Sequence, residues 1–258
     1  MSAPPDFHSL ETFAATDIGR VRAENQDCCA VTQSPQGVVL AVCDGMGGHE
    51  GGAVASRVAM AALHSHLHER ATKDPAADLE RAILAAGQAV RIEARTETRL
   101  RTMGTTCVAA LVTPAGVAYI GNVGDSRAYV LSGASIVQIT RDHTVYEDQL
   151  RSGVRFMAET AEALRHVLTR CLGMDAGLRV DMFELKLAPE DVLLLCSDGL
   201  LAHVDDEEIA QAFLGGDLAT GTRLLIDTAN ARGGSDNISI AVLRWPMRMP
   251  KATPLAAR

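Results

Sequence analysis

The chain has 258 residues, of which 47% are hydrophobic and only 3% aromatic. This composition can build a large aliphatic core and excludes global disorder, while the shortage of aromatic side chains argues against a stacking surface for single-stranded nucleic acid. The formal net charge of −8 would repel a polyanion, so we expect no nucleic-acid partner. An acidic surface instead favours cations.

The cysteines and the N-terminus indicate a cellular compartment. Six cysteines occur without a C-x-x-C pair or zinc-site spacing, which is typical of buried thiols in a reducing cytosol. The opening MSAPPDFHSL lacks the basic and apolar regions of a signal peptide, and no apolar run reaches the length of a membrane span. We therefore expect a cytoplasmic protein that has no membrane partner and is a monomer.

Apolar runs of strand length recur along the chain with short turn signals between them. The predicted strands are 13–17, 28–33, 37–44, 105–113, 116–124, 126–133, 135–140, 179–187, 191–198 and 237–245. Helical periodicity marks 50–70, 77–100 and 206–230, with broken helical character over 144–165. The short connections 34–37, 113–116, 132–134 and 188–191 predict hairpins and hence antiparallel pairing.

This order of elements predicts the fold class. Strand runs interrupted by helix pairs favour an α+β fold over alternating βαβ units. The number of strands suffices for two antiparallel sheets packed face to face and flanked by pairs of helices, an α-β-β-α sandwich. We predict one domain over 10–244, with flexible tails at 1–9 and 245–258.

Four aspartates stand at the ends of these apolar strands. Asp44 ends the run 38–43, Asp198 ends VLLLCSD, Asp236 precedes NISIAVL, and Asp125 lies in the tight turn GNVGDSR. If these ends converge, several negative charges crowd a partly dry place, which is costly unless cations occupy it. Carboxylates are hard ligands, so Mg²⁺ or Mn²⁺ suits them. The alternative is that each acid only forms a turn or a helix cap.

The segment GMGGHEGG after Asp44 carries five glycines within 45–52. Glycines there let backbone carbonyls and water approach an ion without obstruction by side chains. The segment matches neither G-x-G-x-x-G nor a P-loop, and no G-x-S-x-G occurs in the chain. The segment is therefore neither a dinucleotide-binding loop nor a P-loop, and the chain lacks the nucleophile motif of serine hydrolases.

At these residues the chain resembles the metal-dependent protein phosphatases, the type 2C family (PPM). The likeness is a series of motifs in order over about 12–244: TDIGRVRAENQD, AVCDGMGGHEGG, TMGTTCVAALV, GNVGDSRAYVL, TRDHT, LTRCLG, LLLCSDGLLAHV and GGSDNISIAVL. The resemblance implies the sandwich fold and a bacterial enzyme that hydrolyses phosphoserine and phosphothreonine in proteins.

The resemblance also implies an ion-binding role for particular residues. Asp44 would bridge two Mn²⁺ or Mg²⁺ ions, and Gly45 would lend its backbone carbonyl to one of them. Asp198 and Asp236 would hold the other ion. Asp125, together with Asp198, would match a third, weaker site.

Three further residues would act on the substrate or on water. Arg22 would bind the substrate phosphate, since its planar fork meets two phosphate oxygens at once. Without the surrounding motif, a surface salt bridge with Glu24 or Asp27 would be the favoured interpretation. Asp27 would hold an ion-bound water. His49 would act either as general acid toward the leaving oxygen or only as a hydrogen-bonding group. The metal-activated water would attack phosphorus directly.

The implied partners are phosphorylated proteins, including a bacterial Ser/Thr kinase and the substrates of that kinase. Two alternatives stay open: a catalytically silent phosphoprotein-binding module of the same fold, and a metal phosphohydrolase acting on small molecules. The chain departs from many relatives at Gln26, where they carry glutamate, and within 145–170, the flap region of the family, where it lacks a His-Pro-x-Arg-Asn stretch.

Several other residues have competing interpretations. His64 and His68 lie one helical turn apart and could bind a metal, but we favour a partly solvated helix face, and the role of His66 between them is not assigned. His143 could position the flap region or cap a helix. The cysteines beside the acids, Cys43 and Cys196, fit burial best.

Overall fold

We describe a computed structural model of the chain over residues 10–47, 51–154, 157–173 and 177–246. The predicted tail 1–9 lies outside the described residues, as do His49 and residues 247–258 of the predicted tail 245–258. Trp245, which the sequence analysis placed at the start of the C-terminal tail, is described: it is 5% exposed and packs in the central core.

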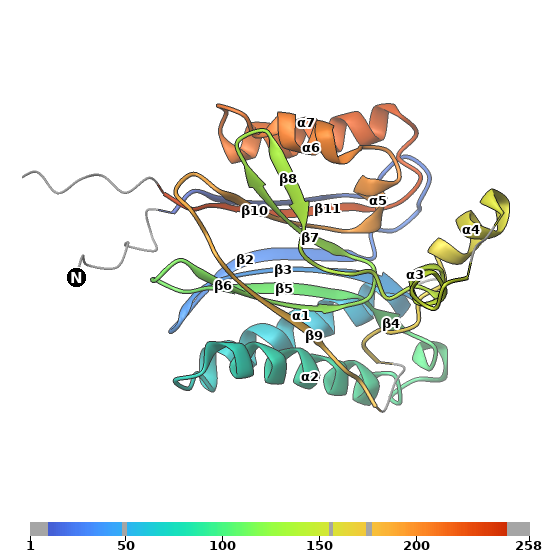
Figure 1. The fold of residues 1–258 in the computed structure, drawn as a ribbon. Coiled ribbons are helices and arrows are strands. Elements are labelled where there is room, and N and C mark those ends of the chain that lie inside the picture. The colour runs from blue at the N-terminus through green and yellow to red at the C-terminus, as the bar shows by residue number, and fades with distance from the viewer. Residues whose placement is uncertain (1–9, 48–50, 155–156, 174–176, 247–258) are drawn as a thin grey trace, which may run out of the picture.

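Two antiparallel sheets form the centre of the molecule (Figure 1). The first sheet consists, in spatial order, of β1 (Thr12–Asp17), β11 (Ile238–Arg244), β10 (Val192–Cys196), β7 (Arg127–Ser132) and β8 (Ser135–Gln138). The second consists of β2 (Asp27–Ser34), β3 (Gly37–Met46), β5 (Cys107–Val112), β6 (Val117–Val123) and β9 (Asp181–Lys186), with the short β4 (Gly104–Thr105) paired to the end of β3.

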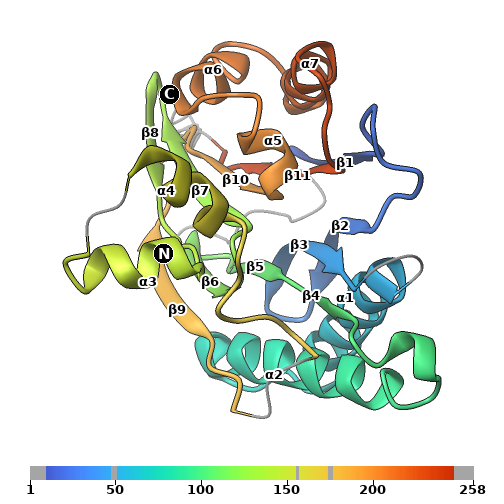
Figure 2. The same cartoon turned by 90° about the vertical axis from the view of Figure 1, so that its right-hand side faces the viewer.

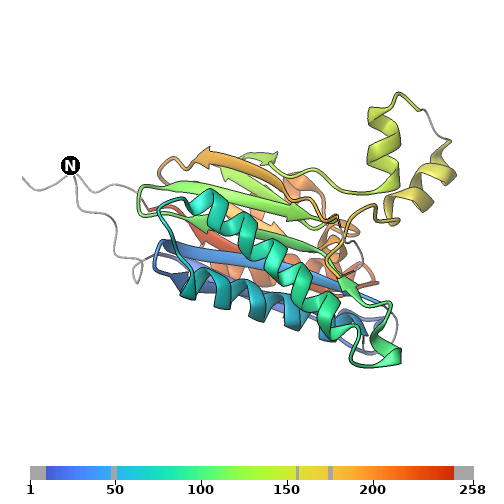
Figure 3. The same ribbon diagram turned by 90° about the horizontal axis from the view of Figure 1, so that it is seen from below.

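Helices cover the outer face of each sheet (Figures 1 and 3). The second sheet is covered by α1 (Gly51–Glu69) and α2 (Pro75–Glu93), and a 3₁₀ turn (Thr98–Leu100) follows them. The first sheet is covered by α5 (Asp198–Leu201), α6 (Asp206–Ala212) and α7 (Leu218–Ala231). Figure 2 looks onto one end of the sandwich, where α3 (Val145–Arg151) and α4 (Ala158–Arg165) project on the side of β7, β8 and β9. Within the described residues, no helix combines the length and apolarity needed to cross a bilayer.

Each central strand is buried on both faces. In β3, Val38, Leu40 and Val42 point into the core between the sheets, whereas Val39 and Ala41 point toward α1 and α2. The same division holds in β10 on the other side of the sandwich. Because neighbouring side chains point to opposite faces of a strand, burial of both faces requires an uninterrupted apolar run. This explains why the sequence shows continuous apolar segments instead of alternation.

The predicted α-β-β-α sandwich is confirmed, with one error of connection. The segment 188–191 was predicted as a hairpin, but it carries the chain from β9 in the second sheet to β10 in the first. The turn 124–126 likewise joins β6 to β7 across the two layers. A short connection can either turn back within a sheet or step across to the sheet packed about 10 Å away, and its length alone does not distinguish the two.

The core between the sheets gives a stability prediction. Leu40→Ala removes a side chain with 0% exposure from this core, so we expect the free energy of unfolding to fall by about 2–5 kcal/mol. The control Leu224→Ala changes a side chain of α7 that is 55% exposed, and a shift within about 0.5 kcal/mol is expected. Urea unfolding followed by circular dichroism measures both, and equal effects would contradict the assigned core.

Candidate active site

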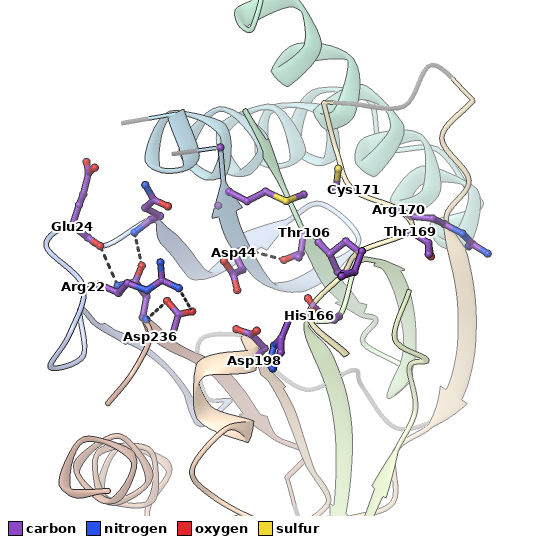
Figure 4. A pocket seen from close by; sticks show the side chains of 18 of the residues that line it. Arg22, Glu24, Asp44, Thr106, His166, Thr169, Arg170, Cys171, Asp198 and Asp236 are labelled. Atoms are coloured by element: carbon purple, nitrogen blue, oxygen red, sulfur yellow. Dashed lines mark hydrogen bonds and ion pairs between the residues drawn. The ribbon is translucent and has the colours of Figure 1, made fainter. Parts of the chain in front are cut away.

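A cavity of about 1070 Å³ opens at the end of the sandwich that carries α5 and β4 (Figure 4). The aspartates predicted to converge do so here: Asp44, Asp125, Asp198 and Asp236 all line it. Arg22 and Gly45 line it as well. Residues separated by up to 214 positions in the chain therefore meet in one pocket, as the strand-end pattern predicted.

Two threonines fix Asp44 at the end of β3. The Thr106 hydroxyl accepts a hydrogen bond from the Asp44 backbone N–H at 2.9 Å, and the Thr105 hydroxyl donates to the Asp44 carbonyl at 2.8 Å. The backbone of Asp44 is thereby satisfied by its neighbours. Its carboxylate projects into the same space as that of Asp198 (Figure 4).

The glycine at position 199 allows Asp198 and Asp236 to lie close together. Asp198 opens α5, and Gly199 packs directly against the turn that carries Asp236. A Cβ atom on Gly199 would lie 2.0 Å from the Asn237 carbonyl oxygen, which no real contact allows. Only glycine therefore permits this approach of the two carboxylates.

Asn237 fastens the loop 18–26, which carries Arg22, to the Asp236 turn. Its amide nitrogen donates to the carbonyls of Ile18 at 2.9 Å and Glu24 at 3.1 Å, and its amide oxygen accepts from the Gln26 N–H at 2.8 Å. The Arg22 guanidinium in turn donates to the Asp236 carboxylate at 2.7 Å. Asn237 was not predicted as a site residue, although it lies in the GGSDN motif that indicated Asp236.

Asp27 lies behind the cavity rather than in its wall. It pairs with Asp44 across β2 and β3, is 8% exposed, and accepts a hydrogen bond from the Ser197 hydroxyl at 2.7 Å. Its other carboxylate oxygen, Oδ1, is buried and has no partner among the described residues. Burial is the main cause that raises the pKa of Asp27 to about 7, and the charges of Asp198 and Asp236 add to it.

The pKa values of the other clustered aspartates are raised for the same reasons. Burial raises the pKa of Asp125 to about 8, and Asp198 contributes to this shift. Burial together with the charge of Asp27 holds the pKa of Asp44 well above its usual range. The pKa of Asp198 is also raised, chiefly by burial, and its Oδ1 is buried without a partner in the described part of the chain. Divalent cations would reverse each of these shifts.

The donor set fits hard ions that keep much of their water. Among the residues that the structure describes, no three carboxylate, imidazole or thiol groups lie close enough to ligate one ion together. Mg²⁺ is commonly held by one or two carboxylates and completes its shell with water and other oxygens. The orphaned Oδ1 of Asp198 at the cavity fits such a ligand, and the orphaned Oδ1 of Asp27 behind the cavity fits an acceptor for ion-bound water.

The structure also shows where the other residues singled out in the sequence lie. At Gly45 a Cβ would lie 2.1 Å from the Gly52 carbonyl oxygen and 2.6 Å from that of Gln26, so the bare loop is needed for close backbone packing as well. His64 is half-buried and belongs to no metal-binding group of the described residues. Cys43 and Cys196 are buried free thiols, as predicted.

Comparison with known proteins gives a consistent result. A family model described as "Protein phosphatase 2C" matches residues 19–228. The serine/threonine phosphatase stp of Listeria monocytogenes is 34% identical over 238 residues, covering 88% of this chain and 93% of the relative. PstP of Mycobacterium tuberculosis is 34% identical over 90% of this chain, but the match spans only 44% of that longer protein.

Solved structures show the same likeness. The catalytic domain of PstP in complex with two manganese ions superposes with a TM-score of 0.79 at 34% identity, covering 91% of this chain and 97% of that one. Stp1 from Staphylococcus aureus superposes with a TM-score of 0.84 at 32% identity, covering 93% and 96% of the two chains.

The close packing at Gly199 predicts a loss of metal affinity. Gly199→Ala must push α5 away from the Asp236 turn, so we expect Mn²⁺ affinity to fall roughly 10–100-fold, as for other changes behind a metal ligand. Gly216→Ala is the control, because a Cβ there meets nothing within 4 Å among the described residues. Isothermal titration with Mn²⁺ compares them, and unchanged affinity in Gly199→Ala would contradict the packing argument.

The raised pKa of Asp27 predicts how the metal-free protein responds to pH. Between the ordinary pKa near 4 and the folded value of about 7, the folded chain retains a proton that the unfolded chain releases. Stability conferred by protonated Asp27 is therefore complete below about pH 4 and is lost as the pH rises toward 7. Asp27→Asn should flatten this decline in chelator-treated protein, measured by urea unfolding from pH 4 to 8; an unchanged slope would show that Asp27 titrates normally.

Proposed function

The chain belongs to the protein phosphatase 2C family, and we propose that its aspartate-lined cavity is the site where phosphoserine and phosphothreonine of proteins are hydrolysed. The enzyme depends on Mn²⁺ or Mg²⁺. One observation carries the assignment: the four strand-end aspartates and Arg22 line a single cavity of about 1070 Å³. That volume greatly exceeds a phosphate group and leaves room for a peptide side chain and its neighbours.

The aspartates would hold the ions from opposite walls of the cavity. Asp44, on the second sheet, faces Asp198, which begins α5 just after β10 of the first sheet, and Asp44 would bridge the two ions. The Gly45 carbonyl would serve one ion and Asp236, with Asp198, the other. Asp125 would contribute to a third site with Asp198, whose charge already perturbs the pKa of Asp125. When bound, the ions lower the pKa of a water toward neutrality and stabilise charge on the phosphoryl group.

Two side chains of this protein act on the substrate and on water. Arg22 is half-exposed at the cavity mouth and can turn from Asp236 to a phosphate, since one guanidinium can serve both acceptors. Asp27 keeps one carboxylate oxygen on Ser197 and leaves Oδ1 free to accept a hydrogen bond from water beside Asp44. The role of His49 as general acid stays a prediction, because His49 lies outside the described residues.

The physiological setting follows from the same proposal. We place the protein in a bacterial cytoplasm, as a monomer that reverses the action of a Ser/Thr kinase on the kinase itself and on its substrates. The relatives are bacterial Ser/Thr phosphatases, and all six cysteines are free thiols, as suits a reducing compartment. A silent binding module has no supporting observation, because each predicted metal acid is present in the cavity.

Activity of the purified chain tests this proposal. We expect Mn²⁺-dependent phosphate release from a phosphothreonine peptide, reduced about 1,000-fold or more in Asp44→Asn because the bridging ligand is lost. Arg22→Lys should mainly raise KM, since lysine cannot form the planar two-point contact. The control Glu97→Gln removes an exposed acid that pairs with Arg99 outside the cavity and should retain activity within a few-fold.

Substrate comparison separates the alternatives. Equal or faster hydrolysis of nucleotides and sugar phosphates than of phosphopeptides would favour a small-molecule phosphohydrolase. Binding of phosphopeptide without any phosphate release in the presence of Mn²⁺ would favour the silent module.

A further inference from the structure

His143 is a buried polar side chain that the proposed reaction does not use. It is 0% exposed and lies just before α3. The sequence left open whether it positions the flap segment, residues 145–170, or caps a helix. The cap is supplied by Thr144, whose hydroxyl accepts from the Glu147 N–H. The histidine is therefore free for another role, and both of its ring nitrogens make contacts.

On one side, His143 is hydrogen-bonded to the turn that carries Asp125. The His143 backbone N–H donates to the Gly124 carbonyl at 3.0 Å, and the Gly124 N–H donates to Nδ1 of the ring at 3.1 Å. On the opposite side, a Cβ at Gly124 would lie 2.6 Å from the Thr106 side chain. Gly124, with φ of +110°, is thus held between His143 and the threonine that also anchors Asp44. Asp125 follows immediately and lines the cavity.

The other side of His143 holds the end of the flap segment. Because Nδ1 accepts a hydrogen bond, a neutral ring carries its proton on Nε2, which lies 3.2 Å from the Asp181 carboxylate. The same carboxylate accepts from Arg170 Nη1 at 2.6 Å, and this Nη1 also lies 3.1 Å from Nε2. The His143 carbonyl also accepts from the Thr169 N–H at 2.8 Å. Residues 168–171, which line the cavity, are therefore attached to the same histidine.

The ring has the protonation state that this arrangement needs. Burial lowers the pKa of His143, so the imidazole is neutral at physiological pH and keeps one acceptor nitrogen for Gly124. A buried donor or acceptor left without a partner is costly, and here each ring nitrogen faces a partner from a different segment. Loss of either the Gly124 contact or the Asp181 contact would leave a buried ring nitrogen unpaired, which lowers the stability of the fold.

We propose that His143 is a positioning residue that ties the Asp125 turn to residues 168–171, so that ion binding at Asp125 and the order of the flap end are coupled. The inference rests on the proposed function only where it takes Asp125 as an ion ligand. Through Nδ1 the histidine sets the position of the Asp125 turn, and through Nε2 and its carbonyl it sets the cavity wall formed by the flap end. An ion on Asp125 therefore stabilises both.

Two amide substitutions separate the two sides of the ring. The side-chain amide of His143→Asn can occupy the position of Nδ1, whereas that of His143→Gln reaches the position of Nε2. We expect His143→Gln to speed hydrogen exchange at the Gly124 amide and to weaken the weakest Mn²⁺ site roughly tenfold, with the tighter sites unchanged. His143→Asn should preserve both values but speed exchange over 168–171. Asp181→Ala should behave like His143→Asn.

Amide exchange and Mn²⁺ titration of the full chain give the decisive comparison. If the Asn and Gln variants change both readouts equally, the histidine only fills space and the inference is overturned. Coupling further requires that saturating Mn²⁺ slow exchange over 168–171 in the parent protein but much less in His143→Asn; equal slowing in both would overturn it.

The variant Asp125→Asn distinguishes failure of this inference from failure of the proposed function. We expect it to lose the weakest Mn²⁺ site. If it binds Mn²⁺ like the parent, the assignment of Asp125 as a ligand is wrong, and so is the coupling. If it loses the site while His143→Gln keeps it, the ligand assignment holds and the positioning role of His143 fails.

Discussion

Repulsion between partly buried carboxylates is the constraint on which this structure depends. Asp44, Asp125 and Asp198 lose water on folding and face one another, and their raised pKa values express the cost. The ion pair of Arg22 with Asp236 and the nearby charge of Arg127 offset only part of this repulsion, since the pKa values of Asp125 and Asp198 remain raised. Divalent cations compensate the repulsion between these carboxylates in the folded chain. Cation binding therefore raises the free energy of unfolding.

Rigid surroundings keep the carboxylates in place despite this repulsion. Each acid stands at the end of a strand or at the start of a helix whose own backbone is tied down by neighbours: Asp44 by Thr106, and Asp198 by the packing of Gly199 on Asn237. The strands behind them are buried on both faces, which limits their movement. The site is thus positioned by the sandwich itself, and the loops mainly contribute Arg22 and the glycines.

Much of the fold and of the candidate site was predictable from the sequence, because the site residues lie at the ends of strongly patterned apolar strands. Apolar runs buried on both faces, each ending in an aspartate, gave the two sheets and the convergence of Asp44, Asp198 and Asp236. The crossing at 188–191 was not predictable, because a short turn has the same length whether it stays in one sheet or changes sheets. The roles of Asn237 and Ser197 were missed for another reason: their partners lie about 170–220 residues away, and no local periodicity records such contacts.

The position of β11 has a consequence for biosynthesis. This strand is the last of the described elements in the chain, yet it lies between β1 and β10 and is the only partner of β1 in that sheet. Asp236 and Asn237 immediately precede it. A ribosome must therefore synthesise and release the chain through Arg244 before the first sheet can close, and a chain that stops before Asp236 cannot assemble the aspartate-lined cavity. Incomplete chains would therefore not dephosphorylate other proteins during synthesis.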